Sequence, residues 1–199
     1  MLAPHAVSKA FIALPLAVLL LAGCSTKANN DTYDLALTPI ADAPSSARNR
    51  QILVPEPTAL KSLNSEQVLV RVSPSEIQYL SDSQWSDRLP RMVQSKLVEA
   101  FENTGKLGGV GQPGQGLAID YQVVADIRAF EIDTSGAKAA NVEISVKILN
   151  DRNGSVRGQR VFSARVPVSG EDNAQFVTAI NRAFAKVGGE IVDWTIRSL

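Results

Sequence analysis

Two runs of alternating apolar and polar residues in the second half of the chain constrain its fold more than any other feature. From residue 117 to 129 every second side chain is apolar, and most intervening ones are polar. Residues 142–148 repeat the pattern with valine and isoleucine. Because successive side chains of a β-strand point to opposite faces, each run predicts a strand with one buried face. The first run is long for one strand, so we expect a bulge or bend within it.

The dipeptide Asn153-Gly154 follows the second run and is a two-residue hairpin signal. Residues 156–168 then supply a third strand. The sequence therefore predicts a three-stranded antiparallel meander that ends near residue 168.

Two segments have the spacing of amphipathic helices. The first follows a turn around Trp85 and ends near Thr104, with Pro90 in its first turn and Gly105 as its stop signal. Its apolar stripe predicts that one face packs on a core.

The second helix is expected to begin at the N-cap residue Asp172, with Gln175 placed to complete a capping box. Its apolar stripe runs as far as Trp194, and such a stripe is usually plain core rather than a lipid groove. The pair Gly188-Gly189 weakens the middle of the helix and permits a bend or close packing.

The remaining elements are shorter. We expect brief strands at 33–37, 52–54, 68–72 and 77–80, and loops at 38–49 and 105–116. The chain has 199 residues, which suits one domain. The predicted fold is a single α/β domain with a mixed, mostly antiparallel sheet, a C-terminal three-stranded meander and two long packing helices.

The N-terminus carries a targeting pattern. Residues 1–23 combine Lys9, an apolar run and the sequence Leu21-Ala22-Gly23 directly before Cys24. The run is shorter than the roughly 20 residues that span a membrane but fits a signal peptide. The four residues ending in Cys24 resemble the lipobox of bacterial lipoproteins, which implies a diacylglyceryl group on the sulfur, cleavage before Cys24 and an added acyl chain such as palmitate.

Cys24 is therefore the expected lipidation site, residues 24–32 the lipidated tether and residues 33–199 the folded domain. An ordinary signal peptide with a free thiol is the alternative, but it would place bulky Leu21 where a small residue is needed. An uncleaved membrane anchor is a further alternative. Ser25 resembles the outer-membrane class of lipoproteins, so we expect an anchor at the periplasmic face of the outer membrane.

Composition restricts the chemistry. The only histidine, His5, lies in the predicted signal peptide, and lipidation would occupy the only cysteine. Serine–histidine and cysteine–histidine pairs and zinc sites are then excluded from the mature chain. We expect no enzyme, no metal and no cofactor, although a hydrolase that uses serine or carboxylates stays open. With 20 acidic and 20 basic residues, nucleic acid is not an expected partner.

Two short motifs suggest other chemistry but lack the context that it needs. Residues 109–114 match G-x-G-x-x-G, yet a helix is expected before them and a strand after them, which reverses the order of a dinucleotide site. Ser135 and Lys138 match S-x-x-K but fall in a predicted turn. Two aromatic residues, Tyr79 and Trp85, lie in or beside a loop and are candidate contacts for a partner or lipid, with plain packing as the alternative.

The order of features resembles the auxiliary lipoproteins of bacterial ABC-type transport systems, the family that accompanies MCE-domain lipid transporters. The matching residues are Cys24, Tyr33-Asp34-Leu35, Ile52-Leu53-Val54, Val70-Arg71-Val72, Tyr79-Leu80, Trp85, Leu89-Pro90, Ala100-Phe101, Phe130-Glu131 and the final helix through Trp194. The resemblance covers nearly the whole mature chain.

The resemblance implies an anticodon-binding-like fold and a non-catalytic role in moving lipids or other hydrophobic compounds between the inner and outer membranes. It also implies partners: an MCE-domain protein, with an ABC permease and an ATPase, and a homo-oligomeric ring of the lipoprotein itself. The alternative function is a structural envelope lipoprotein that supports another assembly.

Overall fold

A computed structural model describes residues 30–37 and 47–199 of the chain. Cys24 and the predicted signal peptide lie outside these residues, as does most of the predicted 38–49 loop. The elements in chain order are β1 (Asp31–Tyr33), β2 (Ala47–Leu53), β3 (Thr58–Ala59), β4 (Gln67–Ser73), β5 (Glu76–Trp85), α2 (Leu89–Asn103), β6 (Leu107–Gly111), β7 (Tyr121–Asp133), β8 (Ala139–Asn150), β9 (Val156–Pro167) and α3 (Asn173–Ser198).

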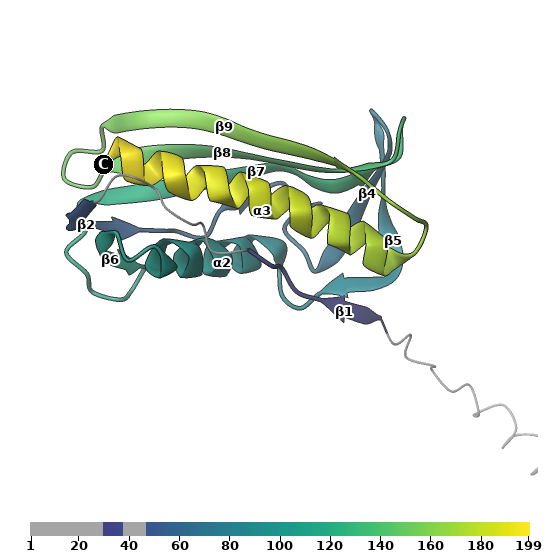
Figure 1. Ribbon diagram of the computed structural model, residues 1–199, viewed down its shortest axis with the longest axis horizontal. Helices are drawn as coiled ribbons and strands as arrows, with labels where there is room; N and C mark the ends of the chain where they lie inside the picture. Colours follow the sequence, from purple (N-terminus) through teal and green to yellow (C-terminus); the bar gives the residue numbers. More distant parts are fainter. Residues whose placement is uncertain (1–29, 38–46) are drawn as a thin grey trace, which may run out of the picture.

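Strand β7 is the centre of one mixed sheet that contains all of these strands (Figure 1). Along one edge β7 pairs with β8, and β8 pairs with β9, both antiparallel. Along its other edge three shorter strands follow one another, all parallel to β7: β2, then β3, then β4. The long strand pairs are thus antiparallel, and the short strand pairs are mostly parallel. The predicted α/β class, the mixed sheet and the meander are confirmed.

The bulge expected in the long strand lies between Ile127 and Ala129, where the β7–β8 register shifts. An extra residue reverses which side chains face the core. Before the bulge Ile127 is buried against the helices, and after it Phe130 and Ile132 take that role. The alternation therefore breaks down at residue 129 although the strand continues to Asp133. The predicted strand limits of 117 and 129 were wrong by four residues at each end.

Two of the predicted loop segments contain strands. β2 begins at Ala47, inside the predicted 38–49 loop, and β6 occupies Leu107–Gly111, inside the predicted 105–116 loop. The two strands pair in parallel. At Gly108 an added Cβ would lie 2.5 Å from the backbone oxygen of Arg48, so glycine permits this close approach. The glycine content of residues 105–116 led to the prediction of a loop. In the structure, glycine instead allows the backbones of β2 and β6 to approach closely.

The N-terminal strand is shorter and earlier than expected. β1 ends at Tyr33, and Leu35 is buried without belonging to a strand. There the backbone N–H of Ala36 donates to Oδ1 of Asn181 on α3, so a helix side chain replaces the strand ladder. β5 is longer than expected: it extends to Trp85, which was predicted to lie in a turn.

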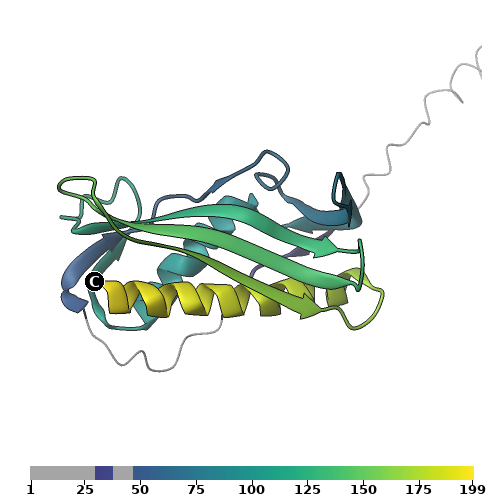
Figure 2. The ribbon, with the colours of Figure 1, turned by 90° about the horizontal axis from the view of Figure 1, so that it is seen from above.

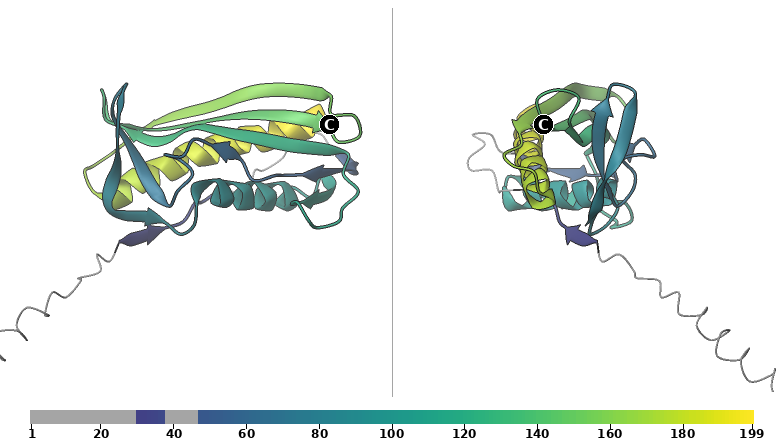
Figure 3. Two further views of the ribbon diagram at one scale, coloured as in Figure 1. Left: turned by 180° about the vertical axis from the view of Figure 1, so that it is seen from behind. Right: turned by 90° about the vertical axis from the view of Figure 1, so that its right-hand side faces the viewer.

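Both predicted helices are present. Pro90 lies in the first turn of α2, and Gly105 follows the helix with a φ of 60°. At the start of α3, the side chain of Asp172 accepts a hydrogen bond from the N–H of Gln175, which completes the predicted capping box. Both helices cover the same face of the sheet, which curves around them (Figure 3).

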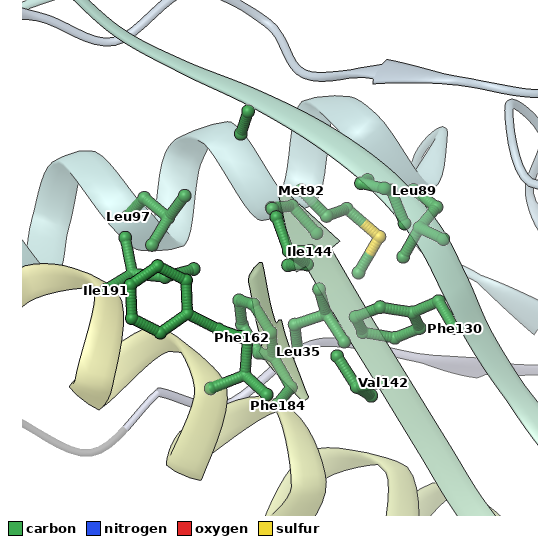
Figure 4. Close-up of a cluster of buried hydrophobic side chains, with 14 of the residues drawn as sticks. Leu35, Leu89, Met92, Leu97, Phe130, Val142, Ile144, Phe162, Phe184 and Ile191 are labelled. Carbon is green, nitrogen blue, oxygen red and sulfur yellow. The ribbon is translucent and has the colours of Figure 1, made fainter. Parts of the chain in front are cut away.

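The core lies between the helices and the buried face of the sheet (Figure 4). Phe130 is at its centre, with ring centroids 6.0 Å from Trp85 and 5.6 Å from Phe184. The stripe of α3 is core, as predicted. Gly188 lies against Leu37, where an added Cβ would come within 2.7 Å of a methyl carbon, so this glycine serves close packing.

The elongated molecule has two distinct ends. β1 and the β4–β5 hairpin form one end, and the C-terminus, the start of β2 and the β8–β9 turn form the other (Figures 1 and 2). β1 is the described strand nearest in sequence to Cys24. We call the end that contains it the β1 end, and the opposite end the distal end.

Candidate functional site

The two predicted contact residues have different positions on β5. Tyr79 is 38% exposed on the projecting hairpin. Trp85 is 1% exposed and packs edge-on against Phe130. The surface role considered for Trp85 is therefore wrong for this fold, and the packing alternative holds. Tyr79 stays a candidate contact.

Tyr79 belongs to an outward face of the β4–β5 hairpin. In the antiparallel register Tyr79 lies opposite Leu69, and Ile77 lies opposite Arg71. Residues two apart on a strand share a face, so Ile77 and Tyr79 form one exposed apolar strip beside the Arg71 side chain. Ile77 is 40% exposed. We refer to Arg71, Ile77 and Tyr79 as the hairpin surface; Figure 3 shows the hairpin at the β1 end of the molecule.

An ion pair between Arg71 and a buried carboxylate lies beside the apolar strip of the hairpin surface. Nε of Arg71 lies 2.6 Å from Oε1 of Glu131, and Nη2 lies 3.0 Å from Oε2, so the pair is bidentate. The Glu131 side chain is only 4% exposed. The hydrogen bond to Glu131 raises the pKa of Arg71. This pair ties β4 to β7 across their short parallel ladder.

A second carboxylate of β7 is held next to the first. Asp133 accepts hydrogen bonds from the hydroxyl and the N–H of Ser135, and Nη1 of Arg165 lies 2.6 Å from its Oδ2. These contacts, the Ser135 hydroxyl first, lower the pKa of Asp133 to about 2. The carboxylate is thus ionised at any physiological pH and fixes the β7–β8 turn to β9.

A polar pocket of about 240 Å³ lies where β1 leads toward α2. Its lining residues are Asp34, Ser86, Asp87, Arg91, Met92, Ser95 and Lys96. Its charges partly compensate each other, with Nζ of Lys96 3.7 Å from Asp34 and Arg91 3.3 Å from Asp87. A second polar pocket, of about 210 Å³, lies on the outer face of the meander beside Asp126 and Arg128. Neither pocket has the apolar lining that an acyl chain requires.

The motifs with tempting spacing have structural roles. Gly109 and Gly111 lie within β6, so the G-x-G-x-x-G segment is a strand and a turn. Ser135 hydrogen-bonds to Asp133, and Nζ of Lys138 lies 2.6 Å from Glu171, so the S-x-x-K residues have separate partners. Among residues 30–37 and 47–199 there is no cluster of three or more potential metal ligands. Neither described helix has a segment long and apolar enough to cross a membrane.

The sequence pointed to Tyr79 as a candidate contact, but it did not reveal the ion pair between Arg71 and Glu131 nearby. Glu131 follows Phe130 in a strand whose alternation had already broken down, and only the bulge assigns it to the outer face. Its sole sequence signal was an acidic residue in an otherwise apolar run, Phe130 to Ile132.

Residues 33–192 match the family described as ABC-type transport auxiliary lipoprotein component. The chain belongs to this family. The match covers most of the folded core, from the end of β1 into the last turns of α3, and confirms the resemblance derived from the sequence.

Solved structures agree with the family. A Xanthomonas campestris protein of family DUF330 superposes with a TM-score of 0.78 at 28% identity, covering 84% of this chain and 95% of that chain. A second, uncharacterized protein gives 0.66 at 17% identity, covering 84% and 99%. This likeness shows the shared fold.

Among curated proteins, an uncharacterized Bradyrhizobium diazoefficiens protein is 29% identical over 183 residues. The match covers 87% of this chain but only 47% of the relative, so the chain spans about half the length of that protein.

Proposed function

We propose that this chain is a non-catalytic, lipid-anchored accessory component of an MCE-type ABC transporter. In this role it would stand at the periplasmic face of the outer membrane, attached through Cys24. It would assist the passage of lipids or other hydrophobic compounds between the two membranes. The family match over residues 33–192, directly downstream of the Cys24 lipobox, carries the proposal.

The packing of the domain supports an accessory role over a cargo carrier. The apolar stripes of the described helices pack in the core and line no lipid groove: Ile180 and Phe184 are 0% exposed. The two pockets described above are small and polar. A domain of this kind acts through its surface and its position, and the hairpin surface with Ile77 and Tyr79 is a candidate docking site. A ring of several copies is the assembly we propose.

The test is co-purification of the full, lipidated chain with the MCE-domain protein of the same organism, after mild crosslinking in the cell. We expect the MCE-domain protein, the permease and the ATPase in the eluate, and a defect in envelope lipid distribution when the gene is deleted. Absence of all three proteins together with an unchanged lipid distribution would reject the proposal. The ring is tested separately: the mass of the detergent-solubilised assembly gives the number of copies that it contains.

A matched pair of variants refines this test. Tyr79→Ala removes an exposed ring from the hairpin surface, and Val161→Ala removes an exposed apolar side chain of β9 away from it. Loss of co-purification with the first variant alone would place the contact at the hairpin. Equal binding by both variants would move it elsewhere.

A further inference from the structure

We propose that the distal end of the domain binds an acidic segment of a partner protein through four basic residues: Arg48, Arg50, Lys106 and Arg157. We call these four residues the distal basic surface. The inference rests on the proposed anchoring at Cys24, and it adds a second contact site to the hairpin surface at the β1 end.

Contacts along three strands bring the four residues together. Arg50 on β2 and Arg157 on β9 both lie over the ring of Tyr121, with guanidinium carbons 5.9 Å and 5.5 Å from its centroid. The N–H of Ala47 donates to the backbone oxygen of Lys106 over 2.8 Å, which sets Lys106 next to the start of β2. Two guanidinium groups close to one ring repel each other, so an anion bound nearby would offset that repulsion.

Arg48, Arg50 and Lys106 have no side-chain carboxylate within 4.0 Å in the described part of the chain. Arg157 has none either, but its guanidinium group donates to the backbone oxygens of Ser198 and Leu199 at the end of α3. Nearby carboxylates are engaged elsewhere. Asp120 accepts from the N–H of Gln51 over 3.0 Å and lies 3.7 Å from Arg152. Asp193 pairs with Arg197 on the same helix.

Cations toward the β1 end are paired instead. Arg71, Arg88, Arg91, Lys138 and Arg165 each have a carboxylate within 3.3 Å. Other described cations also lack a carboxylate within 4.0 Å: Lys61, Lys147, Arg160, Arg182 and Lys186. The distal basic surface differs from them in that two of its guanidinium groups lie over one aromatic ring.

The length of the tether between Cys24 and β1 limits how the distal end can approach the membrane. Seven residue steps separate Cys24 from Asp31, which span at most about 25 Å when fully extended. The 26-residue helix α3 runs along the molecule for about 39 Å. A chain lipidated at Cys24 cannot turn its distal end squarely onto the membrane that holds its own anchor. When the domain stands on its β1 end, the distal basic surface faces the periplasmic space.

The composition of the surface fits a protein partner. Arginine and tyrosine are enriched at protein interfaces, and Val156 beside Arg157 adds an apolar side chain that is 54% exposed. A segment rich in Asp and Glu would match the four cations and would be drawn in at low ionic strength. The proposed partner is such a segment in another protein of the transport system.

The experiment uses the full chain in its native cell, with the photoreactive amino acid p-benzoylphenylalanine in place of Val156. Crosslinked peptides are identified by mass spectrometry in three backgrounds: the parent, Arg48→Glu with Lys106→Glu, and the control Lys61→Glu with Arg182→Glu. The control pair is exposed, makes the same change in net charge and lies outside the surface.

We expect a crosslink to an Asp- and Glu-rich segment of an MCE-domain, permease or other transport-system protein. Its yield should fall about tenfold in the first variant and by less than about twofold in the control. Equal thermal unfolding of the variants shows that both are folded. A crosslink to lipid, to a second copy of this chain or to a neutral segment overturns the inference, as does a yield insensitive to Arg48→Glu with Lys106→Glu.

The same strains separate this inference from the proposed function. The intact mass of the chain reports lipidation of Cys24. A lipidated chain that co-purifies with the transporter but gives charge-insensitive crosslinks overturns the distal surface alone. An unlipidated chain with a charge-sensitive crosslink overturns the anchoring and leaves the surface.

Discussion

At the scale of single residues, the charged pair of Arg71 and Glu131 ties the hairpin to β7. Glu131 is almost fully buried, whereas the Arg71 side chain is 32% exposed. Taking a carboxylate out of water is costly unless its partner stays in place. Removing either side chain alone should therefore cost more than an exposed ion pair ever contributes.

We predict that Arg71→Ala lowers the free energy of unfolding by about 3 kcal/mol, because it leaves the Glu131 carboxylate buried and unpaired. Urea unfolding followed by circular dichroism measures the change. The matched control is Arg128→Ala, whose contacts to Asp126 and Glu143 are exposed and 3.5 to 3.8 Å long. It should cost less than about 1 kcal/mol. Equal losses in the two variants would contradict a buried role for Glu131.

Asp133 makes stability depend on pH in a defined window. Its pKa falls from 3.8 to about 2 on folding, so the unfolded chain binds its proton more readily than the folded chain does. The stabilisation is complete above about pH 5 and is lost as the pH falls through about 2. Between about pH 5 and 2 the free energy of unfolding of the parent falls in part because Asp133 becomes protonated. We predict that this fall is smaller in Asp133→Asn, by on the order of 1 to 2 kcal/mol. An unchanged slope between pH 4 and 2 would show that Asp133 is not its source.

At the scale of elements, the ends of strands and helices follow local rules with unequal success. The capping box of Asp172 and Gln175 starts α3 where the sequence predicts it, because a cap needs only residues that are close along the chain. The bulge after Ile127 moved the end of β7, because it is defined by pairing with β8. Local signals thus predicted helix starts better than strand ends.

Removing the α3 cap tests that local signal. Asp172→Ala deletes the side-chain acceptor for the N–H of Gln175 and should lower the free energy of unfolding by about 1 kcal/mol. Ser169→Ala, in the exposed connection before the helix, is the control and should change it by less than about 0.5 kcal/mol. Thermal or urea unfolding of the two variants gives the comparison. A cost for Ser169→Ala equal to that of Asp172→Ala would assign the effect to the connection rather than the cap.

At the scale of the whole molecule, position is the property that ties fold and function together. The domain is elongated, with β1 at one end and the distal basic surface at the other. An anchor at the β1 end and a docking surface at the distal end would let one small domain bridge a membrane and a partner. The distal basic surface is assembled from residues far apart in the sequence, from Arg48 to Arg157.

The anchor itself is tested at this scale. Cys24→Ser removes the only thiol of the chain, so no thioether-linked lipid can form. We predict that the variant leaves the membrane fraction and that the parent incorporates labelled palmitate, since two acyl chains suffice for stable anchoring. Fractionation of the envelope gives the readout. Retention of Cys24→Ser in the outer membrane would mean that something other than lipid holds the chain there.

The sequence by itself determined the meander, both helices, the α3 cap and the family, because these depend on periodicity and on short-range signals. Only the tertiary structure decided that the glycine-rich segment 107–111 is a strand, that Trp85 is core and that Glu131 is buried beside Arg71. It also decided that Arg50 and Arg157 share the ring of Tyr121. The physical reason is the same in each case: pairing between strands distant in sequence sets which face a side chain takes, and no local pattern encodes it.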